Sequence, residues 1–469
     1  MSRLEHDLLG EREVPRDVYW GIHTLRAREN FDVSGHRIHP ELIRALGQVK
    51  KSCARANMEL GYLTEDIGQA IVTACDEIIG GRLHDQFIVD VFQGGAGTST
   101  HMNANEVIAN RAIEMLGGER GDYDIVHPNN HVNMHQSTND VIPTAIRVAM
   151  CRLHCQLSGT ILELQKALKQ KAEDFAHILK MGRTQHQDAT PITLGAEFAA
   201  YAKVMGRDRH RIEDSEFILK RVNMGGTAIG TGVASPTGFG ILVIEKINED
   251  TNLGLFDARD LVDATQNLDA FATVSSMLKV HAANISKITS DLMLIASGPR
   301  AGWGEITLPE MQAGSSLMPG KVNPVIGEMV EQVAMQVISN DYVVCEVIRR
   351  GRLELNAFQP LLSHCLFESI SLLNQAERIF TEKCVKGIRA NEEVCRELVD
   401  RGWWNWGLPA LVPYIGYEKA TDVARQAARD GTTAREVILS DGMLTEEELD
   451  TILRKGIRAF DKDDVIDRS

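Results

Sequence analysis

The strongest structural signal in this sequence of 469 residues is DVIPTAIRVAMCRLHCQLSGTILELQKALKQKAEDF, from Asp140 to Phe175. Its apolar residues recur at steps of three and four: Ile142, Ile146, Met150, Leu153, Leu157, Ile161, Leu164, Leu168, Ala172 and Phe175. This spacing keeps a straight apolar stripe on one face of an α-helix. Helices of such length normally pack in bundles with others of similar length, so the segment predicts one helix of a bundle.

Four more segments carry helical apolar stripes. They run from Pro191 to about Arg221, from about Gln266 to Ala296, from about Val325 to Arg350 and from about Gln359 to Lys383. His281 lies on the apolar face of the second of these, where a hydrogen-bonded core or interface histidine is a more common role than a metal ligand. Since no alternating strand pattern competes, the sequence predicts an all-α fold with a group of five long helices.

A long connector without helical periodicity, Gly298 to Pro324, separates two of these helices and contains GSSLMPGKVNP. Connectors of this length are commonly lids, binding loops or linkers. A disordered linker would be poor in apolar residues, whereas this one contains six that could pack on a core: Ile306, Leu308, Met311, Leu317, Met318 and Val322. We therefore expect a hinged loop. It would present four polar side chains: Ser315, Ser316, Lys321 and Asn323.

Hydroxyl side chains gather at two predicted helix starts. In GGAGTSTHMNANEV, Thr98 precedes a helical pattern, and in QSTNDVIPTA the cap residues Ser137, Thr138 and Asn139 precede the helix quoted above. Unpaired N–H groups and the helix dipole make such ends good carboxylate sites. The first segment lacks the Gly-Lys-Ser/Thr ending of a nucleotide loop, which argues against ATP or GTP.

A third polar cluster, Thr184, Gln185 and His186, lies in the break KMGRTQHQDATPITLG. Two pairs have metal-ligand spacing, His131 with His135 and Cys151 with Cys155. Without further ligands nearby, we interpret both spacings as coincidence and predict no metal site.

Composition excludes several classes of partner. The formal charge of −15 argues against nucleic acid and against an anionic membrane surface. No apolar run approaches the roughly 18 residues of a membrane span, and the N-terminus has no signal pattern. Eight cysteines without a Cys-x-x-Cys pair are typical of reduced thiols. We therefore expect a soluble, cytoplasmic protein.

The two ends of the chain have shorter predicted helices than its middle. We predict three domains: a mixed helical domain at 1–138, a long-helix bundle with the Ser315 loop at 139–393, and a small helical domain at 394–469. The last contains three of the five tryptophans, Trp403, Trp404 and Trp406. Such a cluster is more often a small core than a binding cage.

Five segments resemble, in order, the signatures of the fumarase/aspartase superfamily of lyases. They are LLGEREVP with HTLRARENF, GGAGTSTHMNANEV, QSTNDVIPTA, GRTQHQDATPITLG and QAGSSLMPGKVNPVIGE. STND rather than SSND, and QAGSS before the loop, favour the aspartase branch over class II fumarases. The resemblance implies three helical domains with a central five-helix bundle and a homotetramer whose bundles form a twenty-helix core. Each active site would then draw its signatures from three subunits.

The resemblance also implies reversible deamination of L-aspartate to fumarate and ammonia, without organic cofactor or catalytic metal. A base would remove a proton beside the β-carboxylate, which becomes a doubly charged, enediolate-like aci-carboxylate before ammonia leaves, and preorganised donors stabilise such a charge. Ser315 would be the base, provided that backbone N–H groups and Lys321 lower its pKa. The implied substrate contacts are Thr98, Ser137, Thr138 and Ser316 on this carboxylate, Lys321 and Asn323 on the other, and Asn139, Thr184, Gln185 and His186 toward the amino group.

One departure from the family pattern separates sister functions. Class II fumarases carry GRTH, but that histidine position is Gln185 here, and His186 follows it. Expelling hydroxide from malate requires a proton donor, whereas ammonia leaves as a neutral molecule. Gln185 therefore favours a lyase of aspartate over a fumarase. The tryptophan segment also differs from the pattern of aspartases, so a related amino acid is an alternative substrate. The loop with Ser315, Lys321 and Asn323 is intact, which argues against a purely structural protein.

Overall fold

A computed structural model of the chain describes residues 1–455, apart from the side chains of residues 403–406 and 454, and the chain forms two compact units. Unit 1 comprises Met1–Ser158, Arg211–Val280 and Met335–Leu373. Unit 2 comprises Gly159–His210, His281–Ala334 and the chain from Asn374 onward. The tryptophan core predicted above rests on side chains that lie outside the described residues. The predicted boundaries of three domains stay a prediction.

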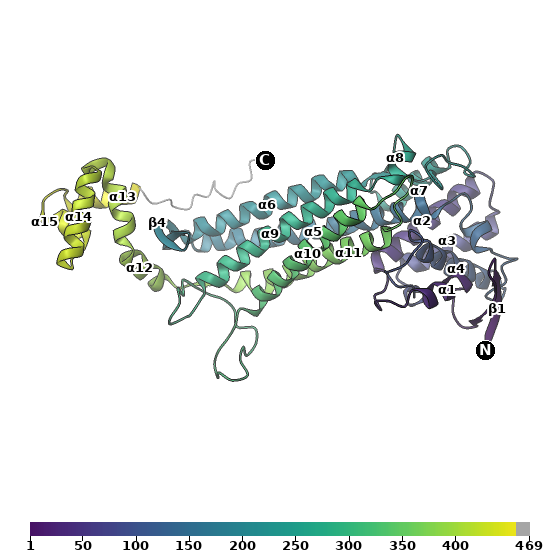
Figure 1. Cartoon of the computed structure of the whole chain (residues 1–469), viewed down its shortest axis with the longest axis horizontal. Helices are drawn as coiled ribbons and strands as arrows, with labels where there is room; N and C mark the ends of the chain where they lie inside the picture. The colour runs from purple at the N-terminus through teal and green to yellow at the C-terminus, as the bar shows by residue number, and fades with distance from the viewer. Residues whose placement is uncertain (456–469) are drawn as a thin grey trace. The chain divides into compact units, whose positions relative to one another are not determined.

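The five predicted long helices are confirmed (Figure 1). They are α5 (Thr138–Asp174), α6 (Leu194–Leu219), α9 (Asp269–Ile295), α10 (Val325–Arg349) and α11 (Gln359–Lys383). Every residue of the apolar stripe of α5 is buried, as its helical spacing demands. Polar bonds between side chains link neighbouring helices: in unit 1 Lys279 of α9 pairs with Asp341 of α10, and in unit 2 Tyr201 of α6 donates to Asp291 of α9 at 2.9 Å. The all-α fold class is therefore confirmed.

The remaining elements are shorter than these five helices. In unit 1 they are β1 (Ser2–Asp7), β2 (Gly10–Pro15), α1 (Ile22–Asn30), α2 (Pro40–Glu59), α3 (Glu65–Ile79), η1 (His84–Gln86), α4 (Thr98–Met115), η2 (Pro128–Val132), β5 (Arg221–Val222), α7 (Phe239–Thr251), β6 (Phe256–Asp257) and α8 (Leu261–Gln266). In unit 2 they are β3 (Leu179–Thr184), β4 (Gln187–Thr193), β7 (Ile306–Thr307), η3 (Val385–Gly387), β8 (Arg389–Ala390), α12 (Glu392–Arg401), α13 (Trp403–Ile415), α14 (Tyr417–Asp430), α15 (Ala434–Ser440) and α16 (Glu446–Lys455).

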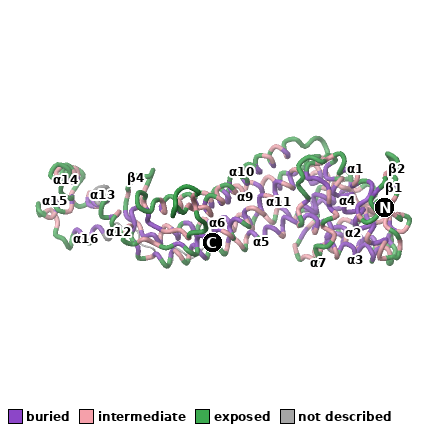
Figure 2. Tube along the Cα trace, turned by 90° about the horizontal axis from the view of Figure 1, so that it is seen from below, coloured by how far each residue is buried: buried purple, intermediate pink, exposed green. Residues whose placement is uncertain are grey.

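Helix α4 is the centre of the N-terminal part of unit 1. It packs on α1 and α3, while α2 packs on α3 and α7. Most residues of α4 are buried, including the polar Asn103, Asn105 and Asn110 (Figure 2). This burial holds the start of α4 at Thr98 in a defined position, because the rest of the helix is enclosed on several sides.

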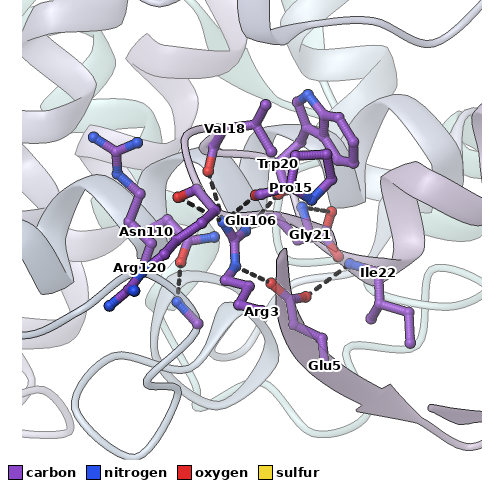
Figure 3. Close-up of polar contacts among 12 residues, drawn as sticks. Arg3, Glu5, Pro15, Val18, Trp20, Gly21, Ile22, Glu106, Asn110 and Arg120 are labelled. Atoms are coloured by element: carbon purple, nitrogen blue, oxygen red, sulfur yellow. Dashed lines mark hydrogen bonds and ion pairs between the residues drawn. The ribbon is translucent and has the colours of Figure 1, made fainter. Parts of the chain in front are cut away.

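Buried carboxylates cap the start of α1 (Figure 3). Glu106, 1% exposed, accepts hydrogen bonds from the backbone N–H groups of Gly21, His23 and Thr24, and Glu5 accepts from Ile22 N–H at 2.8 Å. These N–H groups include ones at the start of α1 that have no hydrogen-bond partner within the helix. The opening segment is thereby fixed to α4.

One prediction about local structure is wrong. We expected Pro191 to open a helix, but Pro191 lies in strand β4, opposite Met181 of the antiparallel strand β3, and the helix begins at Leu194. The register shifts beside Gly182, where a Cβ atom would come within 2.4 Å of the Thr190 carbonyl oxygen. Proline is tolerated in an edge strand of this kind, which has no third strand to receive its missing N–H.

The C-terminal part of unit 2 covers this hairpin. Helix α12 packs on β3 and α13 packs on β4, and Met181 belongs to a buried apolar cluster with Leu411 of α13. A capping box precedes the last described helix, because Thr445 and Glu448 exchange side-chain and backbone hydrogen bonds. None of the described helices combines the length and the apolar content that a membrane span requires.

His281 is a hydrogen-bonded core histidine, as predicted. It is 1% exposed and lies in unit 2 between two buried carboxylates, with its Nδ1 3.0 Å from Asp208 and its Nε2 bonded to Glu377. Burial alone would lower the pKa of His281. The charge and hydrogen bonds of Glu377 and Asp208 outweigh burial and raise this pKa to about 10.

We expect this histidine to make stability depend on pH. A folded-state pKa of about 10, against about 6.5 when unfolded, means that the stabilisation is complete below pH 6.5 and is lost as pH rises through 10. His281→Gln should lower the free energy of unfolding at pH 7 by about 3–5 kcal/mol, because two buried carboxylates lose their cation. Urea unfolding at pH 6.5 and pH 10 measures both effects. An unchanged pH dependence in His281→Gln would contradict the assignment.

Candidate active site

Two of the predicted hydroxyl clusters meet in unit 1. The hydroxyl oxygens of Thr98, at the start of α4, and Thr138, at the start of α5, lie 3.3 Å apart. Gly97 precedes α4 with a φ of 97°, and a Cβ atom there would lie 3.2 Å from Ile142 of α5. Glycine therefore lets the two helix starts approach closely. Thr98 is exposed and Thr138 half-buried, so both can reach a ligand.

Asp140 anchors the start of α5. It is buried, and it accepts hydrogen bonds from the backbone N–H groups of Ser137, Gly225 and Thr227 at 3.0, 3.2 and 3.0 Å. Burial raises the pKa of Asp140 to about 6, and these hydrogen bonds act in the opposite direction. Asn139 is fixed as well, since its side-chain amide donates to the Ala228 carbonyl at 2.7 Å.

A buried chain of polar groups lies behind Thr138, and the sequence analysis missed it. The hydroxyl oxygen of Thr138 is 2.9 Å from His101 Nδ1, and His101 Nε2 is 2.6 Å from Lys50 Nζ. Lys50 also donates to the side-chain oxygens of Asn133 and Gln136 at 2.9 and 2.7 Å. Burial lowers the pKa of Lys50 to about 7 and the pKa of His101 well below its ordinary value. No spacing rule links residue 50 with residue 101, although His101 belongs to a quoted signature.

The third cluster forms the tip of the β3–β4 hairpin in unit 2. Gln185 and His186 are its two turn residues, with φ values of 55° and 62°. Two consecutive left-handed residues match a tight hairpin turn, which usually contains asparagine or glycine. Thr184, Gln185 and His186 are all exposed. A strained turn of larger residues is typical of functional sites.

A cavity of about 240 Å³ lies beside this tip. Gln185 and His186 line it together with Lys180, Arg183, Glu197, Lys287, Asp291, Leu294, Ile295 and Trp303. Lys180 and Arg183 are held by Glu305, which is 0% exposed, at 3.2 and 2.8 Å. The Arg183 guanidinium also lies 4.0 Å from the centre of the Trp303 ring. These ion pairs fix the base of the hairpin and leave its tip to face a ligand.

The Ser315 loop is folded by its own polar groups. The Ser315 hydroxyl oxygen accepts hydrogen bonds from the backbone N–H groups of Leu317 and Met318 at 3.2 and 2.8 Å. Asn323 donates from its side chain to the Gly314 carbonyl at 2.5 Å and so closes the loop. Lys321 is exposed, and within the described part of the chain its ammonium group makes no ion pair.

Our expectation that the loop would pack on a core is wrong for most of its apolar residues. Ile306 is 1% exposed, but Leu317 is 85% exposed and Met311, Met318 and Val322 are exposed as well. Within residues 1–455, no hydrogen bond joins Ser315, Ser316, Lys321 or Asn323 to the hairpin tip. The structure thus brings Thr98 and Thr138 together in unit 1 and carries the loop and the hairpin tip in unit 2.

The two histidines with metal-ligand spacing make other hydrogen bonds. His131 Nδ1 accepts from the His127 N–H, and His135 Nδ1 lies 2.7 Å from the Asn57 side-chain oxygen. Among the described residues, no three or more His, Cys, Asp or Glu side chains are arranged to hold a metal ion. All eight cysteines are free thiols.

Comparison with known proteins gives one family. A family model described as "Lyase" matches residues 10–339, and one described as "Fumarase C C-terminus" matches residues 409–455. The chain is 51% identical to an aspartate ammonia-lyase of Bacillus subtilis over 96% of this chain and 94% of that one. It is 46% identical to the aspartate ammonia-lyase of Escherichia coli over the same shares.

Solved structures agree with these matches. A fumarate lyase:delta crystallin from Brucella melitensis superposes with a TM-score of 0.93 at 48% identity, covering 97% of this chain and 99% of that one. A class II fumarase from Schistosoma mansoni also gives 0.93, at 30% identity over 97% and 98%. With the resemblance now supported across nearly the whole chain, this protein belongs to the fumarase/aspartase superfamily of lyases and, within it, to the aspartate ammonia-lyase family.

Proposed function

We propose that this chain is a carbon–nitrogen lyase that converts L-aspartate reversibly to fumarate and ammonia. The observation that carries the proposal is 46–51% identity to proteins named aspartate ammonia-lyase over 96% of the chain. Identity to the class II fumarase, whose fold matches equally well, is only 30%. The substrate distinction therefore rests on the relatives and on Gln185, and not on the fold.

In the proposed reaction, Ser315 takes the proton from the carbon beside the β-carboxylate. The electron pair of the broken C–H bond moves into that carboxylate and forms the aci-carboxylate, and it then forms the C=C bond of fumarate as the C–N bond breaks and ammonia leaves. Two backbone N–H bonds to the Ser315 oxygen support this role, because such donors favour the alkoxide form. The step needs no organic cofactor and no catalytic metal.

The donors in unit 1 suit the developing double charge. Thr98, Ser137 and Thr138 lie at helix starts, whose N–H groups and dipoles stabilise anions. We assign the β-carboxylate to these three residues together with Ser316. The exposed ammonium of Lys321 and the amide of Asn323 would hold the α-carboxylate. Asn139 and Thr184, beside Gln185 and His186, would face the amino group.

We further propose a homotetramer in which several subunits build each active site. Helix α10 carries three exposed apolar residues at helical spacing. Met335, Ile338 and Tyr342 have exposed fractions of 63, 41 and 69%. An apolar stripe of this kind is typical of a surface that another subunit covers. The 85% exposure of Leu317 in the Ser315 loop supports the same arrangement. A cytoplasmic location and the division into domains at 1–138, 139–393 and 394–469 belong to the same proposal.

We expect the purified enzyme to form fumarate from L-aspartate and not, at a comparable rate, from L-malate. Gln185 stands where a fumarase needs a proton donor for hydroxide, and ammonia needs none. The ultraviolet absorbance of fumarate, followed with each substrate alone, measures the difference. Fumarate from malate but not from aspartate would favour a fumarase instead. Faster release from another amino acid would indicate a sister lyase.

A further inference from the structure

The buried residues Lys50 and His101 have no role in the reaction proposed above, yet they end on one of its hydroxyl groups. His101 is 1% exposed and Lys50 is 0% exposed. Their bonds form one continuous line from Lys50 Nζ through the His101 ring to the Thr138 hydroxyl, over distances of 2.6 and 2.9 Å. Continuous buried lines of this kind set the direction of every hydrogen bond in them.

The lysine determines which nitrogen of His101 carries the proton. Three acceptors surround Lys50 Nζ, namely the side-chain oxygens of Asn133 and Gln136 and the Nε2 atom of His101. They match the three N–H bonds of the ammonium form of Lys50, which prevails below its pKa of about 7. Burial lowers the pKa of His101, so its ring is neutral and has a single N–H. With Nε2 accepting from Lys50, that N–H lies on Nδ1 and points to Thr138.

This direction decides what Thr138 can offer to a ligand. Because its oxygen accepts from His101, its single hydrogen remains available as a donor. The Thr98 hydroxyl is engaged in another hydrogen bond, since it donates to the Gly95 carbonyl at 2.7 Å. Of the two hydroxyls that meet at the helix starts, Thr138 is therefore the better donor to an anion.

We propose that Lys50 and His101 are positioning residues that fix the Thr138 hydroxyl as a hydrogen-bond donor toward the substrate carboxylate. The identity of that carboxylate rests on the proposed function. The effect should grow during the reaction, because the carboxylate gains charge when the proton is removed. Loss of one such donor affects kcat more than KM.

Two substitutions of His101 separate positioning from packing. His101→Asn retains an N–H donor near the Nδ1 position, so kcat for L-aspartate should stay within about threefold of wild type. His101→Leu fills similar space without a donor, and kcat should fall about tenfold with less than about a threefold change in KM. His154→Leu is the matched control, because His154 is also 1% exposed, lies in α5 and bonds to the Met150 carbonyl. Its kcat should remain unchanged.

A double-mutant cycle identifies Thr138 as the group through which His101 acts. In the Thr138→Val background, His101→Leu should cause no further loss of kcat. Equal losses in His101→Asn and His101→Leu, or a full tenfold loss in the Thr138→Val background, would overturn the proposal. If Lys50→Met folds, its kcat should fall as much as that of His101→Leu. If it does not fold, the His101 variants alone test the proposal.

Binding of succinate, measured by calorimetry, keeps this test separate from the proposed function. Succinate carries two carboxylates and cannot react, and we expect His101→Leu to weaken its binding at least twofold and His101→Asn to preserve it. If the wild-type protein fails to deaminate aspartate while the two variants still show these succinate affinities, the proposed reaction is refuted and the positioning role is retained. Equal succinate affinities in the two variants, or no succinate binding to wild type, would overturn the positioning role.

Discussion

Ser315→Ala is expected to lower kcat for L-aspartate by roughly a thousandfold or more, with KM changed far less. The substitution removes the proposed base, while the carboxylates of the substrate keep their other donors. Stability should hardly change, since Ser315 is only half-buried in a surface loop and its hydroxyl bonds only to neighbouring backbone. Steady-state kinetics and a thermal unfolding curve for the same preparation measure the two quantities.

Lys321→Ala is the matched comparison within the loop. It removes a charge that would contact the substrate in the ground state and in the transition state, so KM should rise while kcat falls. If Ser315→Ala keeps more than a few per cent of turnover while Lys321→Ala does not, another group is the base. Near-normal activity of both variants would mean that the loop has no catalytic role.

Mixing the inactive Ser315→Ala variant with the weakly active Thr138→Ala variant is expected to raise activity above that of either variant alone if subunits share their sites. Thr138→Ala damages the donors of unit 1, and Ser315→Ala damages the loop of unit 2. In mixed tetramers made from equal amounts, each intact site needs its loop from one variant and its helix starts from the other. Random assembly gives about one quarter of wild-type activity under this model.

The loop supplies the control for this experiment. Ser315 and Lys321 lie on one connector, so Ser315→Ala mixed with Lys321→Ala should recover almost nothing. Co-expression from two differently tagged copies, followed by sequential affinity purification, isolates the mixed tetramers for assay. No recovery with the Thr138→Ala partner, despite proven mixed assembly, would place the whole site within one chain.

The long helices could be predicted because their information is local. A stripe such as Ile142 to Phe175 must be buried along its whole length, and only a bundle of similar helices does this. The helix starts at Thr98 and Thr138 were also readable, since cap residues act on their own backbone. The family signatures were recognisable for a similar reason, because each is a short continuous segment of the chain.

The hairpin at Gln185 and His186 could not be predicted in the same way. The segment contains a proline and glycines next to residues of mixed preference, and proline is accepted both in the first turn of a helix and in an edge strand. The close approach of Gly182 to the Thr190 carbonyl, and the packing of α12 and α13 on the two strands, support the strand pairing. The packing of α12 and α13 on the strands joins residues about 200 positions apart in sequence, which no local pattern reveals.

The sequence by itself determined the helical class, the five long helices, the superfamily and the polar residues that carry the proposed chemistry. Only the tertiary structure showed that Thr98 and Thr138 meet, that Lys50 and His101 stand behind Thr138, and that Leu317 and its neighbours are exposed. The physical reason is the distance along the sequence over which each interaction acts. Helix periodicity and capping act within a few residues, whereas a hydrogen bond between residues 50 and 101, or the exposure of a loop, depends on how distant elements pack.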